Sequence, residues 1–89
     1  MTILEQVERF LLTEVAVDFD KKSFGPDSDL LEQRILDSLG VLKLVLFLER
    51  TFGIQVADED VVPENFESLN VIAKFVQGKM QNTNPQFGS

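Results

Sequence analysis

The residues that most directly suggest chemistry are three neighbours, Asp37, Ser38 and Leu39, which end a long irregular stretch and begin a periodic apolar one. Asp37 is a good N-cap for a helix that starts at Ser38, because its carboxylate can accept the unpaired N–H groups of the first turn. The positive end of the helix dipole would then favour an anion, so a phosphodiester on the Ser38 hydroxyl would be well placed there. The plainer alternative is that Asp37 and Ser38 only cap the helix.

The acidic residues elsewhere give weaker patterns. Asp18 and Asp20 have the opening spacing of a calcium-binding loop, but the sixth position lacks Gly and Asp29 replaces Glu at the twelfth. The acidic run at residues 58–60 is more typical of a solvated surface, so we expect no metal site. Paired carboxylates for glycoside hydrolysis are compatible with the spacing, yet a chain of 89 residues leaves little room for a substrate cleft.

Two residue types that often supply catalytic or metal-binding groups are missing from the chain. It contains no His and no Cys, which excludes Ser-His and Cys-His nucleophilic pairs and the common zinc sites. No disulfide can form, and Glu5 and Glu8 stand where a secretory signal would be positively charged, so we expect the cytoplasm.

The charge balance bears on the kind of partner. Eight Lys plus Arg against fifteen Asp plus Glu give a formal net charge of −7, which argues against nucleic acid and against an anionic membrane surface. The longest apolar run, at residues 44–48, is far too short to span a membrane. Cationic proteins are the natural complement, and we expect a monomer.

Helical periodicity predicts three longer helices and one short helix around one small core, an all-α four-helix bundle. The predicted elements are a helix over about residues 3–16 with Thr2 and Glu5 as a capping box, a long pinned loop over 18–37, a helix over 38–51 that stops at Gly53, a short helix from Pro63 to Phe66, and a last helix capped by Ser68 with Gly78 near its end. Residues 1–79 should form the domain, and residues 80–89 a disordered tail.

The same periodicity predicts the core. The expected buried stripes are Leu4, Val7, Leu11 and Val15; Val41, Leu44, Val45, Leu48 and Phe52; and Leu69, Ile72, Ala73 and Val76.

The central helix carries a second apolar face in addition to its core stripe. That face holds Leu39, Leu42, Leu46 and Phe47, with Gly40, Lys43 and Arg50 also on the outer side. We expect it to dock partners through apolar contact more than through acidic steering. Core packing remains the alternative for any one of these residues.

The stretch from Asp27 to Leu39 resembles the phosphopantetheine attachment region of acyl and peptidyl carrier proteins, in which an Asp-Ser-Leu triplet opens the second helix. The resemblance continues from Leu44 to Ile54, with the family's Glu-x-x-Phe-Gly-Ile exit, and covers about residues 3–77. Residues 30–33 and 35–38 look most like freestanding D-alanyl, aminoacyl or polyketide-extender carriers. Fatty-acid carriers have a strongly acidic second helix, and Lys43 and Arg50 depart from that pattern.

This resemblance implies a carrier acted on by enzymes and not an enzyme itself. Ser38 would bear 4′-phosphopantetheine, with Asp37 and Leu39 beside it, and hold an acyl or aminoacyl group as a thioester. Implied partners are a phosphopantetheinyl transferase, an activating or loading enzyme, and downstream acyl-transferring enzymes of polyketide, nonribosomal-peptide or cell-envelope biosynthesis. The alternative is an unmodified helical interaction module that binds one partner through the outer face of the central helix.

Overall fold

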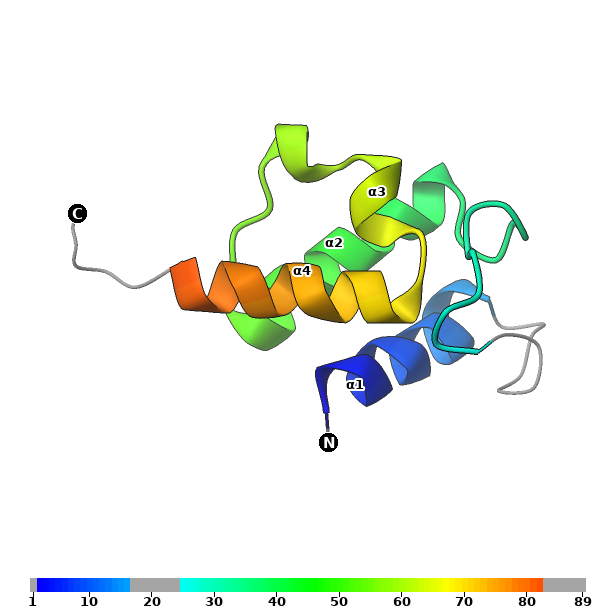
Figure 1. Cartoon of the computed structure of the whole chain (residues 1–89), viewed down its shortest axis with the longest axis horizontal. Helices are drawn as coiled ribbons and strands as arrows, with labels where there is room; N and C mark the ends of the chain where they lie inside the picture. The colour runs from blue at the N-terminus through cyan, green and yellow to red at the C-terminus, as the bar shows by residue number, and fades with distance from the viewer. Residues whose placement is uncertain (1, 17–24, 83–89) are drawn as a thin grey trace.

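The computed structural model describes residues 2–16 and 25–82, and all the regular structure within these ranges is helical. In chain order the elements are α1 (Ile3–Phe10), the π-helical turn η1 (Leu11–Val15), α2 (Ser38–Phe52), the 3-10 turn η2 (Asp58–Asp60), α3 (Pro63–Phe66) and α4 (Leu69–Asn82). α1 packs against both α2 and α4, while α3 packs on α4 (Figure 1). The predicted all-α fold with three longer helices and one short helix is confirmed.

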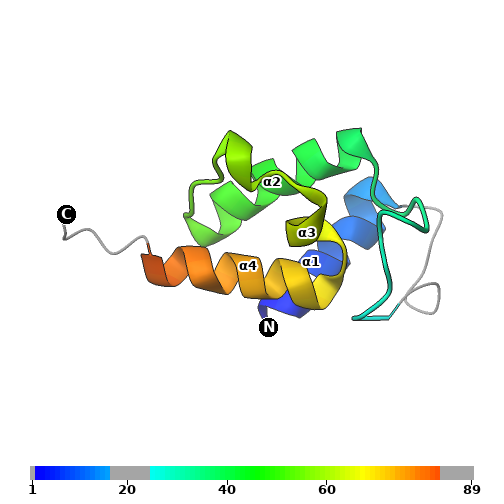
Figure 2. The same ribbon diagram turned by 45° about the horizontal axis from the view of Figure 1, so that its top comes forward.

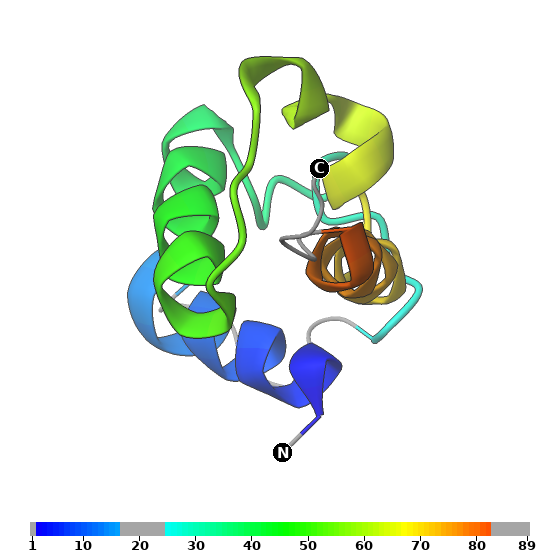
Figure 3. The ribbon, with the colours of Figure 1, turned by 90° about the vertical axis from the view of Figure 1, so that its left-hand side faces the viewer.

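The three longer helices surround a common interior, which is seen along the molecule in Figure 3 with α1 below and α2 and α4 on either side. The short α3 lies between α2 and α4 in the view of Figure 2, and Figure 3 shows it on the side opposite α1. The three longer helices and η1 contribute side chains with no exposed surface, namely Val7 from α1, Leu11 from η1, Leu44 and Leu48 from α2, and Leu69, Ile72 and Val76 from α4. Burial of these apolar side chains is the main source of stability.

α1 begins as predicted and ends differently. The Thr2 hydroxyl accepts a hydrogen bond from the Glu5 N–H, and the Glu5 carboxylate accepts one from the Thr2 N–H, which is a capping box. At its far end the helix widens, and the Ala16 N–H donates to the Leu11 carbonyl at 2.6 Å. The Thr13 hydroxyl donates to the Arg9 carbonyl one turn earlier, a contact that commonly bends helices.

The predicted stripe of α2 is correct at its centre. Leu44 and Leu48 are fully buried, whereas Val41, Val45 and Phe52 are half-buried at its edges. Gly53 ends the helix in the left-handed conformation, with φ of 66°.

Two residues predicted on the outer side of α2 are covered by neighbouring segments. Gly40 is buried, and Phe47 is half-buried against α1. The Phe47 ring stacks on Phe10 at 4.3 Å between centroids and meets Phe52 edge-on at 6.2 Å. The placement of Gly40 and Phe47 on the exposed face was therefore wrong, because η1 and Leu36 cover Gly40 and α1 covers Phe47.

The described part of the long loop is tied to the N-terminal start of α4, as expected. The Leu30 N–H donates to the Glu67 carbonyl at 2.7 Å, and Asn70 bonds both the Pro26 carbonyl and the Asp27 carboxylate. Three apolar side chains anchor this segment in the core: Leu30, Ile35 and Leu36. Residues 18–24 of the predicted loop lie outside the described residues.

α4 continues to Asn82, three residues beyond the predicted end of the domain at residue 79. Gly78 lies inside the helix and does not end it. The rest of the predicted tail, residues 83–89, lies outside the described residues. Across residues 2–16 and 25–82, no helix has the length and apolar character needed to cross a membrane.

Candidate functional site

The start of α2 is organised by Asp37. This residue has an extended backbone, with φ of −107° and ψ of −173°, and its carboxylate accepts the Gly40 N–H at 2.8 Å. Its carbonyl accepts the Val41 N–H, also at 2.8 Å, which begins the helical ladder. Asp37 therefore caps α2 as the sequence predicted.

Ser38 is the first residue of α2 and is exposed, as is Leu39 beside it. The Ser38 hydroxyl forms no hydrogen bond with any described residue, and neither do the N–H groups of Ser38 and Leu39. These two N–H groups are the helix donors that lack an intrahelical acceptor. The site thus offers a free hydroxyl beside free donors at the positive end of a 15-residue helix.

Two features that the sequence analysis missed position this serine. A Cβ on Gly40 would lie 2.8 Å from Val15 Cγ1 and 3.1 Å from Leu36 Cδ1, so only glycine lets α2 approach η1 this closely. Arg34 has a φ of 60°, a left-handed conformation that turns the loop into the buried pair Ile35 and Leu36. The Asp37-Ser38-Leu39-Gly40 run contained a signal for the close approach, since glycine inside a helix often marks one.

A cavity of about 890 Å³ opens beside Ser38. Its polar wall consists of Asp37, Ser38, Glu32 and Arg34, and most of the remaining wall is apolar. α2 contributes Val41 and Leu42, and the opposite side is formed by Val61, Val62, Pro63 and Phe66. Because this opposite wall includes α3, the cavity could not be inferred from the spacing around Ser38 alone.

The segment that leads into α3 is fastened to α4. Asp60 forms an ion pair with Lys79 at 2.6 Å, and its carbonyl accepts the Asn65 side-chain amide at 2.7 Å. The hydrogen bond from Lys79, together with one from the Ala57 N–H, lowers the pKa of the Asp60 carboxyl below its usual range. These contacts hold Val61 and Val62 in place as a wall of the cavity.

The predicted docking residues divide into two groups. Leu39, Leu42 and Leu46 are 61%, 60% and 56% exposed, and Lys43 and Arg50 are exposed beside them. Phe47 is separated from this group by its packing on α1. We use the term leucine row for Leu39, Leu42 and Leu46.

The described residues contain no group of three side chains suited to holding a metal ion. The chain also has no His or Cys that could serve a nucleophile. What the site offers chemically is an accessible hydroxyl in an anion-favouring position next to an open, mainly apolar cavity.

Comparison with known proteins identifies the family. Residues 2–76 match the family described as phosphopantetheine attachment site. An acyl carrier protein from Thermosynechococcus vestitus is 28% identical over 78 residues, covering 88% of this chain and 91% of that protein.

Two solved structures are similar in fold and sequence. The solution structure of a holo acyl carrier protein from Nitrosomonas europaea has a TM-score of 0.74 and 30% identity, covering 91% of this chain and 99% of that one. The apo KstB-PCP structure has a TM-score of 0.67 and 34% identity, covering 82% of this chain and 80% of that one. The chain therefore belongs to the phosphopantetheine-binding acyl and peptidyl carrier proteins, a family of non-enzymatic carriers whose prosthetic group is phosphopantetheine.

Proposed function

We propose that the Ser38 hydroxyl is the attachment point of 4′-phosphopantetheine and that the protein presents an acyl or aminoacyl thioester to partner enzymes. The observation that carries this proposal is the exposed Ser38 hydroxyl, which has no partner among the described residues and lies beside two free N–H groups of α2. A phosphodiester there would be stabilised by the helix dipole and by those donors.

The residues around Ser38 fit the prosthetic group. The Asp37 carboxylate is engaged by the Gly40 N–H, so the cap does not require the serine side chain. The adjacent cavity of about 890 Å³ has mainly apolar walls that could shelter the arm or an apolar cargo from water. When attached, the group supplies the thiol that carries the cargo, since the chain has no Cys.

We further propose a role in polyketide, nonribosomal-peptide or cell-envelope biosynthesis, with the protein acting as a cytoplasmic monomer. The exposed surface of α2 supports the proposed biosynthetic role, because its free charges are Lys43 and Arg50 and not carboxylates. The similarity to the KstB-PCP structure at 34% identity points the same way. The partners would be a phosphopantetheinyl transferase, an activating or loading enzyme, and downstream acyl-transferring enzymes, all of which would approach α2 along the leucine row.

Intact-mass spectrometry tests the attachment site. Wild-type protein incubated with a phosphopantetheinyl transferase and coenzyme A should gain the mass of one phosphopantetheine group, and Ser38→Ala should gain none. Ser28→Ala is the matched control, since the Ser28 hydroxyl is occupied by the Gly25 N–H at 2.8 Å. Circular dichroism should show unchanged helicity in Ser38→Ala, because Asp37 still caps α2. A modified Ser38→Ala protein would refute the site, and a folded wild type that gains no mass would favour the unmodified interaction module.

A further inference from the structure

Resting on the carrier function proposed above, we propose that α2 docks on a partner protein whose contact surface is apolar and bears carboxylates along one edge only. In the complex, this carboxylate-bearing edge of the partner lies beside the flank of α2 that faces α1. The proposal follows from how charge and apolar surface are divided around the exposed side of α2.

The leucine row forms the centre of this surface. Its three side chains recur at intervals of three and four residues and are each more than half exposed. The apolar surface continues on the side of α3, since Leu42 lines the cavity together with Val61 and Val62, which are 39% and 36% exposed. Grouped apolar exposure of this kind marks an interaction site in a small protein.

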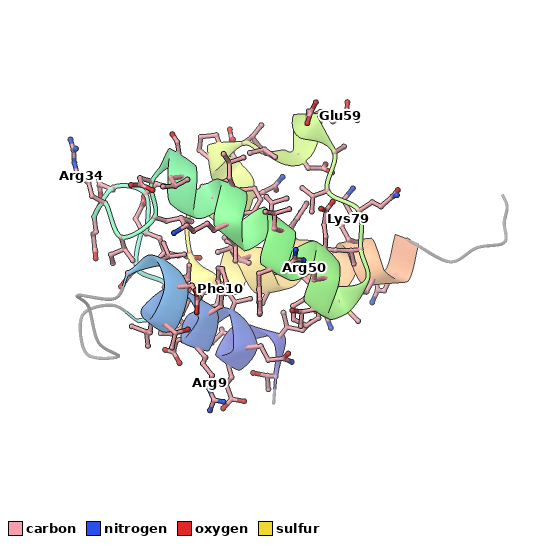
Figure 4. All side chains as sticks on the ribbon, turned by 180° about the vertical axis from the view of Figure 1, so that it is seen from behind. Arg9, Phe10, Arg34, Arg50, Glu59 and Lys79 are labelled. Carbon is pink, nitrogen blue, oxygen red and sulfur yellow. The ribbon has the colours of Figure 1, made fainter. Side chains whose placement is uncertain are left out.

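Lys43 and Arg50 lie on the flank of the leucine row that is farther from α3. Helical periodicity places Lys43 and Arg50 between the leucine row and Phe47, whose ring packs on Phe10 of α1. Figure 4 shows Phe10 on α1 and Arg50 on the neighbouring α2. Neither Lys43 nor Arg50 forms an ion pair with a described residue. Both charges are therefore available to a partner.

The single carboxylate of α2 is withdrawn from this surface. Glu49 is half-buried, and its carboxylate accepts the Val56 N–H at 2.9 Å in the segment after α2. Among the side chains of α2 itself, the flank toward α3 thus presents mainly apolar groups, whereas the charged groups on the flank toward α1 are Lys43 and Arg50. The net charge of −7 points to cationic partners in general, but the local charge of this face points to an acidic edge.

A partner protein fits this surface better than a membrane does. Two cations on a chain of net charge −7 would not overcome repulsion from an anionic bilayer. The leucine row also starts beside Ser38, so a partner seated on it would meet the proposed attachment site directly.

A pair of designed peptides tests the proposal. Both are amphipathic helices with a leucine stripe, and one edge carries glutamate in the first peptide and lysine in the second. The full-length protein should bind the glutamate peptide roughly tenfold more tightly at low salt, and the ratio should shrink at high salt. A spin label on the glutamate edge should broaden the amide signals of Lys43 and Arg50 more than those of Val61 and Val62.

Charge reversal provides the matched variants. The double variant Lys43→Glu/Arg50→Glu should invert the preference between the two peptides, whereas Lys74→Glu on exposed α4 surface should preserve it. Equal binding, a preference that survives the double variant, or broadening centred on Val61 and Val62 would overturn the proposal. Formation of a dimer that is lost in the Lys43→Glu/Arg50→Glu variant would also overturn it. Binding to phosphatidylglycerol vesicles that is lost in the same variant would do so as well. Failure here with normal modification of Ser38 would leave the carrier function intact, whereas an unmodified wild type would refute that function separately.

Discussion

Replacing Gly40 with alanine measures how closely α2 must approach η1. The added Cβ would lie 2.8 Å from Val15 Cγ1, 3.1 Å from Leu36 Cδ1 and 3.3 Å from the Asp37 carboxylate. Neither apolar neighbour moves easily, because Val15 is β-branched and Leu36 is buried. Overpacking of this kind costs about 1–3 kcal/mol, while a helical Gly→Ala change alone gains about 0.5–1 kcal/mol. The free energy of unfolding should therefore fall by roughly 0.5–2 kcal/mol.

Urea denaturation of four variants, Gly40→Ala, Gly78→Ala, Val15→Ala and the double variant Val15→Ala/Gly40→Ala, separates the cost of the clash from the gain in helix propensity. Gly78→Ala in α4 is the control, because nothing lies within 4 Å of its added Cβ and the variant should gain about 0.5–1 kcal/mol. Adding Val15→Ala to Gly40→Ala removes the closest clash, so the penalty at Gly40 should shrink in that background. If Gly40→Ala were as stable as the wild type, the helices would be able to separate freely, and the argument for a required close approach would fail.

Three further predictions concern the core, the α1–α2 contact and the α4 ion pair. Leu44→Ala should lower the free energy of unfolding by about 2–5 kcal/mol in urea, whereas Leu42→Ala should change it by less than about 0.5 kcal/mol; similar losses at both would mean that α2 is rotated. Phe47→Ala should lower the free energy of unfolding by about 2 kcal/mol, and a negligible loss would mean that the Phe47 ring is not packed on α1. Lys79→Met should raise the pKa of Asp60 toward 3.8 in an NMR titration. Because the pKa of Asp60 is lower in the folded protein than in the unfolded chain, the ion pair contributes its full stability above the unfolded pKa. The difference in Tm between wild type and variant should therefore narrow as the pH falls through the lowered pKa of the folded protein.

The sequence alone determined the features that depend on neighbours along the chain. The Asp37 cap, the start of α2 at Ser38 and the end at Gly53 follow from cap chemistry within a few residues. The burial of Leu44 and Leu48 follows from the helical period, because the centre of an apolar stripe faces the core whatever packs there.

The tertiary structure decided what lies at the edges of those stripes. Phe47 and Gly40 are covered only because α1 and its π-helical turn reach that side of α2, and no local rule specifies which neighbouring helix does so. Glu49 is half-buried because its carboxylate accepts a hydrogen bond from the Val56 N–H, seven residues later in the chain. The cavity beside Ser38 likewise exists because the Asp60–Lys79 pair and α3 bring Val61 and Val62 opposite α2. Contacts between segments distant in the chain determine which residues of α2 are covered and where the cavity lies. Local periodicity could therefore indicate the serine but not the surface that surrounds it.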